Sequence, residues 1–531
     1  MNYRSFPRTQ RWLRRDSKEK TAGSMLLLTL FSSFVLATLA LGISFLSQIY
    51  LRTNSWRMNS IRLDYASENG IKTVLAEVMR NTEKIPLPKV LSEADYEKLQ
   101  ADLRNGQVGF LQQILELSFP IEILEAAEDL EWTSRADFLL EGFVEASTFD
   151  QARCKLMVES EGKIKGLKPG RKSYLRGRLE VLCGHIPLFA FPLLVNKNLS
   201  QQEQNDFIPK NAIELVGRPQ NLLPPRADFA AEPLIPRDAD GLIAKALNIK
   251  IFRPQDLSPA RLRFALGLEE SDAPIPDGVY LIHNDLGLGG VYVQGNLDEL
   301  TLAIEEDFQL IFFKMGGNSW LLQFSPSQSK THFISPSGRL FFDLIPLGLI
   351  IVNGRIESFG GGTVDATGKI VPLQNEEKVP SLLQGVNLTL VASDKVTISS
   401  HLIRQGVVWQ DGIPYLKEKS GQLIIFSTGK DLWQDEAREG GITVDPGDAS
   451  QLEIHASLAT GGDGFRLAGE NKLVELAGSL QTTDYTSSGN RLRIYSQHLS
   501  AILAPDAVTP LTQEAVIFLS AFESQEWREY R

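Results

Sequence analysis

The most pronounced hydrophobic pattern in the chain is an uncharged stretch close to its N-terminus. No residue between Lys20 and Arg52 carries a charge, and the central part, residues 25–46, is almost entirely apolar. About 20 such residues suffice to cross the hydrocarbon core of a bilayer as a helix. A cleaved secretory signal would have a shorter apolar region, and a buried soluble helix is seldom apolar on all sides over this length. The pattern therefore predicts a transmembrane helix.

Charges on either side of this stretch predict its orientation. Residues 1–22 contain seven Lys and Arg residues and two acidic residues, a net charge of +5, whereas the whole chain carries −11 and the remainder therefore −16. Basic flanks of a transmembrane helix stay on the cytoplasmic side. We therefore expect a cytoplasmic leader at 1–22 and a single-pass protein of the inner membrane, with its acidic body in the periplasm or on the cell surface. The negative charge also argues against a nucleic-acid partner.

The helical pattern continues beyond the apolar stretch. From Arg52 to about Asn81 the chain lacks proline, and apolar residues recur at steps of three and four, interrupted by the acidic Glu68. This stripe consists of Met58, Ile61, Tyr65, Ile71, Leu75 and Val78. Pro86 then ends the pattern. The sequence therefore predicts one long rod over residues 23–83 that crosses the membrane and packs one face against another part of the protein.

Two short segments of this rod resemble a known family. Ala22-Gly23-Ser24 joins the basic leader to the apolar helix, and Tyr65-Ala66-Ser67-Glu68-Asn69-Gly70 lies on its extension. Together they resemble the N-termini of PilX-type minor pilins of type IV pili and of the large minor pseudopilins of type II secretion. The resemblance implies that a prepilin peptidase cuts between Gly23 and Ser24, and that the helix then packs with other pilin-like subunits.

One position departs from the family pattern. Major pilins have glutamate as the fifth residue after the cleavage site, and this sequence has Leu28 there. Some minor pilins and pseudopilins, among them one at the filament tip, also lack this carboxylate. The departure therefore favours an initiating or tip location over repeated incorporation along a filament. A plain single-pass anchor with a coincidental glycine is the alternative.

Residues 84–208 are expected to form an α+β domain. Short helices are predicted at its start, one of them capped by Ser92, and alternating apolar and polar residues over 141–195 predict an antiparallel meander. Cys154 and Cys183 lie on two of the predicted strands. They either form a disulfide, which an exported compartment permits, or remain two buried thiols.

The rest of the chain is expected to divide into a linker and a β-rich domain. Residues 209–237 contain six prolines and predict a Pro-rich linker. After two short helical segments, at 240–247 and 258–268, the sequence of the domain at 238–531 is typical of β structure. The predicted fold class is therefore α+β, a long N-terminal helix followed by a mainly β body.

Internal echoes within this last domain predict its architecture. Residues 290–300 resemble 348–359, and a one-residue gap brings Gly295 opposite Gly354. Leu452-Glu-Ile-His-Ala-Ser-Leu resembles Val474-Glu-Leu-Ala-Gly-Ser-Leu, 22 residues later. Short strands at such a spacing predict a β-solenoid, in which each turn buries its apolar face against its neighbours. An antiparallel sandwich with coincidental similarity is the alternative.

The sequence lacks recognisable catalytic and metal-binding motifs. Its six histidines are scattered, with no His-Glu-x-x-His pair, and His455 in an alternating strand is interpreted as a structural histidine. Gly287-Leu-Gly-Gly290 precedes a predicted strand, whereas a dinucleotide loop leads into a helix. The acidic segments 445–448 and 461–464 have turn composition rather than the dense carboxylates of calcium loops. We therefore nominate no catalytic, cofactor-binding or metal-binding residue.

These observations favour a non-enzymatic, membrane-anchored, pilin-like component of a type IV pilus or type II secretion-like assembly. Its expected partners are the lipid bilayer, other pilin-like subunits and a prepilin peptidase. The alternative is a tethered extracytoplasmic enzyme acting on polysaccharides, or an adhesin or binding module, on a β-helix. A cleft within 275–505 with paired carboxylates and aromatic side chains would indicate the enzyme. Trp320, Trp409 and Trp433 are available for stacking there.

Overall fold

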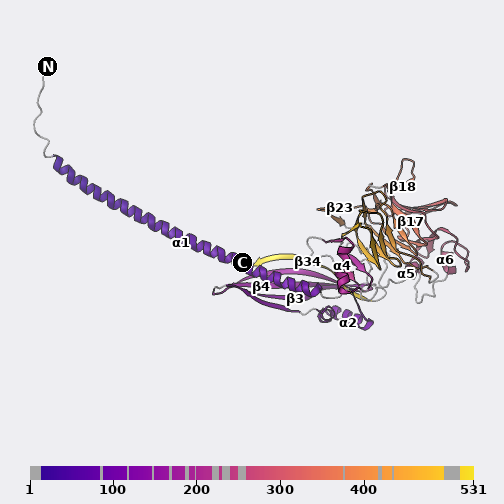
Figure 1. Cartoon of the computed structure of the whole chain (residues 1–531), viewed down its shortest axis with the longest axis horizontal. Helices are drawn as coiled ribbons and strands as arrows, with labels where there is room; N and C mark the ends of the chain where they lie inside the picture. Colours follow the sequence, from indigo (N-terminus) through magenta and orange to yellow (C-terminus); the bar gives the residue numbers. More distant parts are fainter. Residues whose placement is uncertain are drawn as a thin grey trace, which may run out of the picture.

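A long N-terminal helix projects from a large β-rich body in the computed structural model of the protein (Figure 1), which agrees with the expected α+β class. The structure describes residues 13–83, 88–116, 119–145, 149–166, 170–185, 191–197, 199–217, 227–229, 239–248, 259–374, 377–416, 421–432, 436–495 and 515–530.

The helix α1 (Leu13–Glu83) runs without interruption from the basic leader to the body. Its 71 residues correspond to a rod of about 107 Å at 1.5 Å per residue. From Leu27 onward it is long and apolar enough to cross a membrane, and none of its most apolar window is buried inside the protein. The predicted rod is therefore one continuous helix, with its N-terminal half free of the body (Figure 1).

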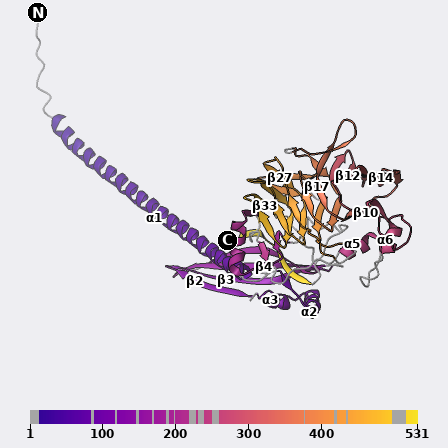
Figure 2. The ribbon, with the colours of Figure 1, turned by 45° about the vertical axis from the view of Figure 1, so that its right-hand side comes forward.

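The C-terminal half of α1 lies against an antiparallel sheet (Figure 2). Its strands follow the order β1 (Lys89–Val90), β34 (Val516–Tyr530), β5 (Arg171–Gly184), β4 (Phe149–Ile164), β3 (Leu130–Val144) and β2 (Ile121–Ala127). The antiparallel pairing expected over 141–195 is present as far as Gly184, but residues 193–195 pair in parallel within another sheet, and the antiparallel sheet begins earlier, at Ile121. It also takes in β34 from the end of the chain, between β1 and β5. The meander is thus completed by a segment that is distant in sequence.

Two short helices also contribute to the hydrophobic core between α1 and the antiparallel sheet. They are α2 (Glu93–Arg104) and α3 (Gly109–Ile114). Ser92 caps α2 as predicted, because its hydroxyl accepts a hydrogen bond from the backbone N–H of Asp95 at 3.1 Å. Apolar residues of both helices share a core with α1 and with strands β3, β4 and β5.

The face that α1 turns toward the sheet differs in part from the predicted stripe. Ile71 and Val78 are buried as expected, but Met58, Ile61 and Tyr65 are 58%, 41% and 60% exposed. Ala66, Ser67 and Gly70 face the sheet instead. The sheet approaches the helix so closely here that only small side chains fit, so apolar periodicity identified the wrong face in this part of the helix.

The body consists mainly of parallel sheets. One has the order β8 (Ala227–Phe229), β6 (Leu193–Val195), β31 (Ser479–Thr482), β28 (Ser457–Thr460), β25 (Gln422–Ser427), β20 (Asn387–Ala392), β16 (Leu349–Asn353), β10 (Gly287–Gln294) and β9 (Gly278–Asn284). A second has β11 (Glu299–Glu305), β17 (Ile356–Val364), β21 (Val396–Ile398), β26 (Ile442–Val444), β29 (Phe465–Leu467) and β32 (Tyr485–Ser487). A third has β27 (Gln451–Ile454), β30 (Leu473–Ala477), β33 (Arg491–Tyr495) and β7 (Ile213–Val216). Apolar side chains from all three form one core.

The chain visits these sheets in turn. Strands β27, β28 and β29 belong to three different sheets, and β30, β31 and β32 repeat the same order one level further on, each parallel to its predecessor. Residues that align in the two similar segments are paired in the parallel strands: Leu452 lies opposite Val474, and Ser457 lies opposite Ser479. Likewise Gln294 lies opposite Asn353. The similar residues are therefore neighbours in space, and the strands are parallel rather than antiparallel.

Antiparallel strands and two helices cover the end of the body that lies far from α1 (Figures 1 and 2). Strand β9 pairs antiparallel with β10, and the second sheet continues through β12 (Phe308–Met315), β13 (Asn318–Ser325), β14 (Lys330–Ser335) and β15 (Gly338–Phe342). The helices are α5 (Ala239–Ala246) and α6 (Pro259–Ala265). Small peripheral pairs are β17 with β18 (Ile370–Pro372), β19 (Pro380–Leu382) with β22 (Ile403–Arg404), and β23 (Val407–Gln410) with β24 (Ile413–Leu416).

The predicted linker at 209–237 is wrong where the structure describes it. The helix α4 (Gln201–Lys210) crosses its first boundary. Strand β7 pairs with β33, and β8 pairs with β6, so both belong to the parallel sheets. The prolines do not prevent this, because they lie outside these two short strands. The domains predicted at 84–208 and 238–531 therefore exchange strands instead of following one another.

Candidate functional site: an exposed apolar helix on a close-packed seat

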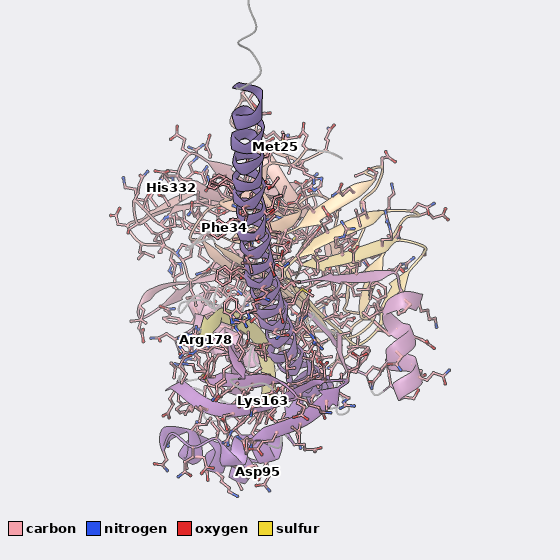
Figure 3. The ribbon with its side chains drawn as sticks, turned by 90° about the vertical axis from the view of Figure 1, so that its left-hand side faces the viewer. Met25, Phe34, Asp95, Lys163, Arg178 and His332 are labelled. Carbon is pink, nitrogen blue, oxygen red and sulfur yellow. The ribbon has the colours of Figure 1, made fainter. Side chains whose placement is uncertain are left out.

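The free half of α1 carries the largest exposed apolar surface among the described residues. Met25, Leu28 and Phe34 are 73%, 70% and 67% exposed, and Figure 3 labels Met25 and Phe34 on this half of the helix. Each large apolar side chain left in water costs about 1.5–3 kcal/mol relative to burial. This surface therefore requires cover from lipid or from other helices.

The residues implied in processing lie at the start of this surface. Gly23 and Ser24 are part of the α1 backbone. Leu28 follows on the bare helix, and no side chain of the described body contacts it. The resemblance to pilins and the cleavage it implies remain predictions.

The C-terminal half of α1 packs against the antiparallel sheet through small residues, and we call this contact, centred on Ser67 and Gly70, the seat. The Ser67 hydroxyl lies 2.7 Å from that of Ser173 on β5, and a Cβ added at Gly162 on β4 would stand 2.6 Å from the backbone nitrogen of Ser67. Gly70 is equally restricted, because a Cβ there would clash with the hydroxyls of Ser134 and Ser160. The segment Tyr65–Gly70, which carries the family resemblance, is thus the point where helix and sheet approach most closely. Glu68 lies half-buried at the edge of this contact.

Charged groups also hold the helix, just N-terminal to this seat. Arg171 at the start of β5 forms an ion pair with Asp64 at 2.5 Å and donates a hydrogen bond to the Ser60 hydroxyl at 2.9 Å. Arg62 pairs with Asp129 in the β2–β3 turn. The bare half of the helix therefore projects from a firmly attached base.

The two cysteines are free thiols buried behind this seat. Cys154 lies opposite Leu179, whereas Cys183 lies opposite Asp150, four residues further along the strand. That offset is about 14 Å at 3.4 Å per residue, and a disulfide needs Cα atoms within about 7 Å. The disulfide alternative is therefore wrong for this structure. Burial raises the pKa of the Cys154 thiol to about 12 and raises the pKa of the Cys183 thiol as well.

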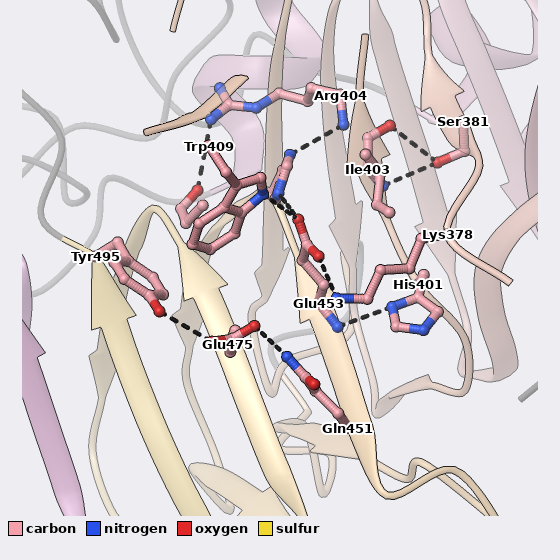
Figure 4. A network of polar contacts seen from close by, with 12 residues as sticks. Lys378, Ser381, His401, Ile403, Arg404, Trp409, Gln451, Glu453, Glu475 and Tyr495 are labelled. Atoms are coloured by element: carbon pink, nitrogen blue, oxygen red, sulfur yellow. Dashed lines mark hydrogen bonds and ion pairs between the residues drawn. The ribbon is translucent and has the colours of Figure 1, made fainter. Parts of the chain in front are cut away.

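The body also contains a network of buried, hydrogen-bonded polar side chains on the third parallel sheet (Figure 4). Glu453 on β27 is its centre, with only 4% of its side chain exposed. It accepts hydrogen bonds from Trp409 Nε1 at 2.9 Å and Lys378 Nζ at 2.7 Å. Its other neighbour, His455 Nε2, lies 2.6 Å from Oε1.

The protonation states of Glu453 and His455 follow from their contacts. Burial lowers the pKa of His455, so the ring is neutral at pH 7. Its Nδ1 accepts a hydrogen bond from the Arg404 backbone N–H at 3.2 Å, which leaves the proton on Nε2, facing Glu453. Burial alone would raise the pKa of Glu453, but the hydrogen bonds from His455 and Lys378 outweigh it and lower the pKa. His455 is therefore a hydrogen-bonded, buried histidine, and it lies in the connection between β27 and β28 rather than within the predicted strand.

Glu475 lies directly beside Glu453 on the next strand, β30. It accepts hydrogen bonds from Gln451 and from the Tyr495 hydroxyl, the latter at 2.9 Å. Tyr495 in turn packs edge-on against Trp409, with ring centroids 5.0 Å apart. The network therefore fastens the hairpin β23–β24, which carries Trp409, onto the third sheet.

This network contains the paired carboxylates that the enzyme alternative requires, but both are covered and hydrogen-bonded on each oxygen. The aligned echoes already placed Glu453 and Glu475 at equivalent positions, so a signal for their proximity existed in the sequence. Nothing in the sequence indicated Lys378 or Trp409 as partners, because they come from distant peripheral segments. Trp320 lies elsewhere, in a cavity lined by β9 and β13, and Trp433 lies outside the described residues.

Within the described part of the chain, no group of three or more His, Cys, Asp or Glu side chains is arranged to hold a metal ion. Comparison with protein-family models, with curated proteins and with solved structures found no match for this chain.

Proposed function

We propose that this chain is a non-enzymatic, membrane-anchored, pilin-like component of a type IV pilus or type II secretion-like assembly. The observation that carries the proposal is the division of α1 into a bare apolar half and a half seated on the antiparallel sheet. A helix that served only as a tether would need neither the 71-residue length nor the close-packed seat.

In this proposal the function of the helix is association. The bare half is first covered by the lipid of the inner membrane, with the basic leader in the cytoplasm and the body outside. On assembly, apolar faces of neighbouring helices replace the lipid, and packing at small residues supplies the favourable energy in place of a hydrophobic effect. Leu28, which has no charge for a neighbour to neutralise, favours an initiating or tip position.

We further propose that the body is a β-solenoid. The supporting observations are the parallel stacking in three sheets and the 22-residue echo that follows its register. Such a stack is stiff along its axis because each turn packs on its neighbours. It would hold the far end of the body at a fixed distance and angle from the membrane.

Processing is tested by expressing the full chain together with a prepilin peptidase and determining the N-terminal residue by mass spectrometry. We expect a mature N-terminus at Ser24 and none when the peptidase is inactive. Gly23→Val should block cleavage, whereas Gly42→Val, at a helical glycine with open space around it, should not. Retention of residues 1–23 in the parent chain would refute the processing step.

Association is tested by photocrosslinking in the native membrane. A photoreactive amino acid at Phe34, on the bare helix, should form adducts with other proteins that have an N-terminal apolar helix. The same group at Leu124, which is 77% exposed on the body, serves as the control and should not form these adducts. Adducts with lipid alone at Phe34 would refute the assembly function and leave a plain anchor.

A further inference from the structure

A cavity of about 400 Å³ opens beside the antiparallel strands β9, β13 and β14. Figure 2 shows β14 at the end of the body that lies far from α1. Strand β9 forms one wall, β13 and the β14–β15 turn form another, and Leu266 after α6 contributes to its lining. Its volume lies within the range of small-molecule sites, about 300–1,000 Å³. None of the side chains of the Glu453 network lines it.

The floor of the cavity is aromatic. Trp320 and Phe333 are 9% and 5% exposed and belong to the core of the body, so their positions are set by packing. Tyr280 contributes a third ring, and its hydroxyl donates a hydrogen bond to the Pro276 carbonyl oxygen at 2.9 Å. These rings are therefore in place before any ligand arrives, which reduces the entropy cost of binding.

The rim of the cavity is polar and bears little charge. Asp277, Asn318 and His283 line it together with serines of the β14–β15 turn. Burial lowers the pKa of His283, so this ring is neutral at pH 7. Among the described lining residues Asp277 is the single carboxylate, and none is Lys or Arg. An anionic ligand would therefore meet a repulsive charge and no compensating cation.

We propose that this cavity binds a neutral saccharide, with a sugar ring against the aromatic floor and its hydroxyls at the Asp277 and Asn318 rim. A sugar ring combines an apolar face of C–H groups with a polar edge, which matches this floor and rim. Glycoside hydrolysis by the usual route needs two carboxylates on either side of the bond, and the lining supplies one. The site therefore retains a saccharide rather than cleaving it, and its action is independent of the assembly function.

The test uses the full chain in lipid nanodiscs and measures binding of methyl glycosides of glucose, galactose and N-acetylglucosamine, with glucuronate as the anionic comparison. Saturation-transfer NMR and calorimetry report binding. We expect at least one neutral glycoside to bind and glucuronate to bind more weakly. Asn318→Ala should weaken binding about 3- to 10-fold, the worth of one hydrogen bond. Asp277→Asn should strengthen binding of glucuronate.

The matched control is Asp307→Asn, an exposed carboxylate in the β11–β12 turn outside the cavity, which should leave every affinity unchanged. Asn318 and Asp277 are both exposed, so their substitution leaves the fold intact, and an unchanged thermal transition checks this. Absence of saturable binding of all three neutral glycosides at about 10 mM would overturn the proposal. Binding that is indifferent to both cavity variants would overturn it equally.

Discussion

The close approach of helix and sheet at Gly162 leads to a quantitative prediction. In Gly162→Ala the new Cβ would lie 2.6 Å from the Ser67 nitrogen and 2.8 Å from the Leu63 carbonyl oxygen. Both are backbone atoms of α1, so no side-chain rotation relieves the contact. An ordinary carbon contact of about 3.5 Å requires the helix to move away by about 0.9 Å.

The cost of this movement follows from the contacts it breaks. Overpacking of this kind costs about 1–3 kcal/mol, and loss of the Ser67–Ser173 hydrogen bond adds about 1 kcal/mol. Replacing glycine by alanine returns about 0.4–1 kcal/mol by restricting the unfolded chain. We therefore expect the free energy of opening at this seat to fall by about 1–3 kcal/mol, which raises the opening equilibrium constant roughly 5- to 150-fold.

The buried thiols report this opening. Cys154 and Cys183 share a core with Ile71 and Val74 of α1, and burial raises the pKa of the Cys154 thiol to about 12, so a thiol reagent at pH 8 reacts only after the core opens. The labelling rate should rise about 5- to 150-fold in Gly162→Ala.

Gly142→Ala is the matched control for this experiment. It lies on β3 in the same sheet, and nothing stands within 4 Å of its added Cβ. Its labelling rate should stay within about twofold of the parent, because surface changes of this kind alter stability by less than about 0.5 kcal/mol. Equal labelling rates in parent and Gly162→Ala would show that the helix is not held at this seat, and the reasoning would fail.

Three further predictions concern the anchor, the polar network and the thiols. Phe34→Arg costs about 2.5–3.5 kcal/mol in the bilayer centre, so it should lower the carbonate-resistant membrane fraction, whereas Leu124→Arg on the body should not. Because the folded pKa of Glu453 is lowered, its stabilisation is present above about pH 4.3 and lost as pH falls further. Glu453→Gln should therefore be less stable than the parent at pH 7, with a urea-midpoint gap that narrows toward pH 3; a constant gap contradicts this. The melting temperature should be the same with and without reductant, since Cys154 and Cys183 are unbonded, and a decrease on reduction would indicate a disulfide.

Local patterns predicted the features that depend on near neighbours along the chain. The uncharged stretch identified α1, because length and apolarity along the chain are enough to recognise a helix that could span a membrane. The hydroxyl of Ser92 identified the start of α2, since a cap involves residues three positions apart. The 22-residue echo anticipated which residues of β27 and β30 lie opposite one another, because stacked turns with the same shape require similar side chains at the same position.

Contacts between distant segments were beyond such patterns. The C-terminal strand β34 joins the first sheet, and β7 from the Pro-rich segment joins the last one, although neither has a sequence feature that names its partner. The buried face of α1 was predicted incorrectly for a related reason. Hydrophobicity suggested that Met58 packs against the sheet, but the glycine and serine surface of the sheet leaves room only for Ala66, Ser67 and Gly70 at this distance.

The sequence by itself thus determined an apolar N-terminal helix, its expected orientation and a repetitive β body, since each follows from composition and spacing along the chain. Only the tertiary structure decided which face of α1 is buried, that the two thiols are too far out of register to bond, and that Glu453 is paired with Lys378 and accepts a hydrogen bond from His455. These depend on backbone separations of a few ångströms between segments remote in sequence. Close packing sets such distances, and no periodicity along the chain records them.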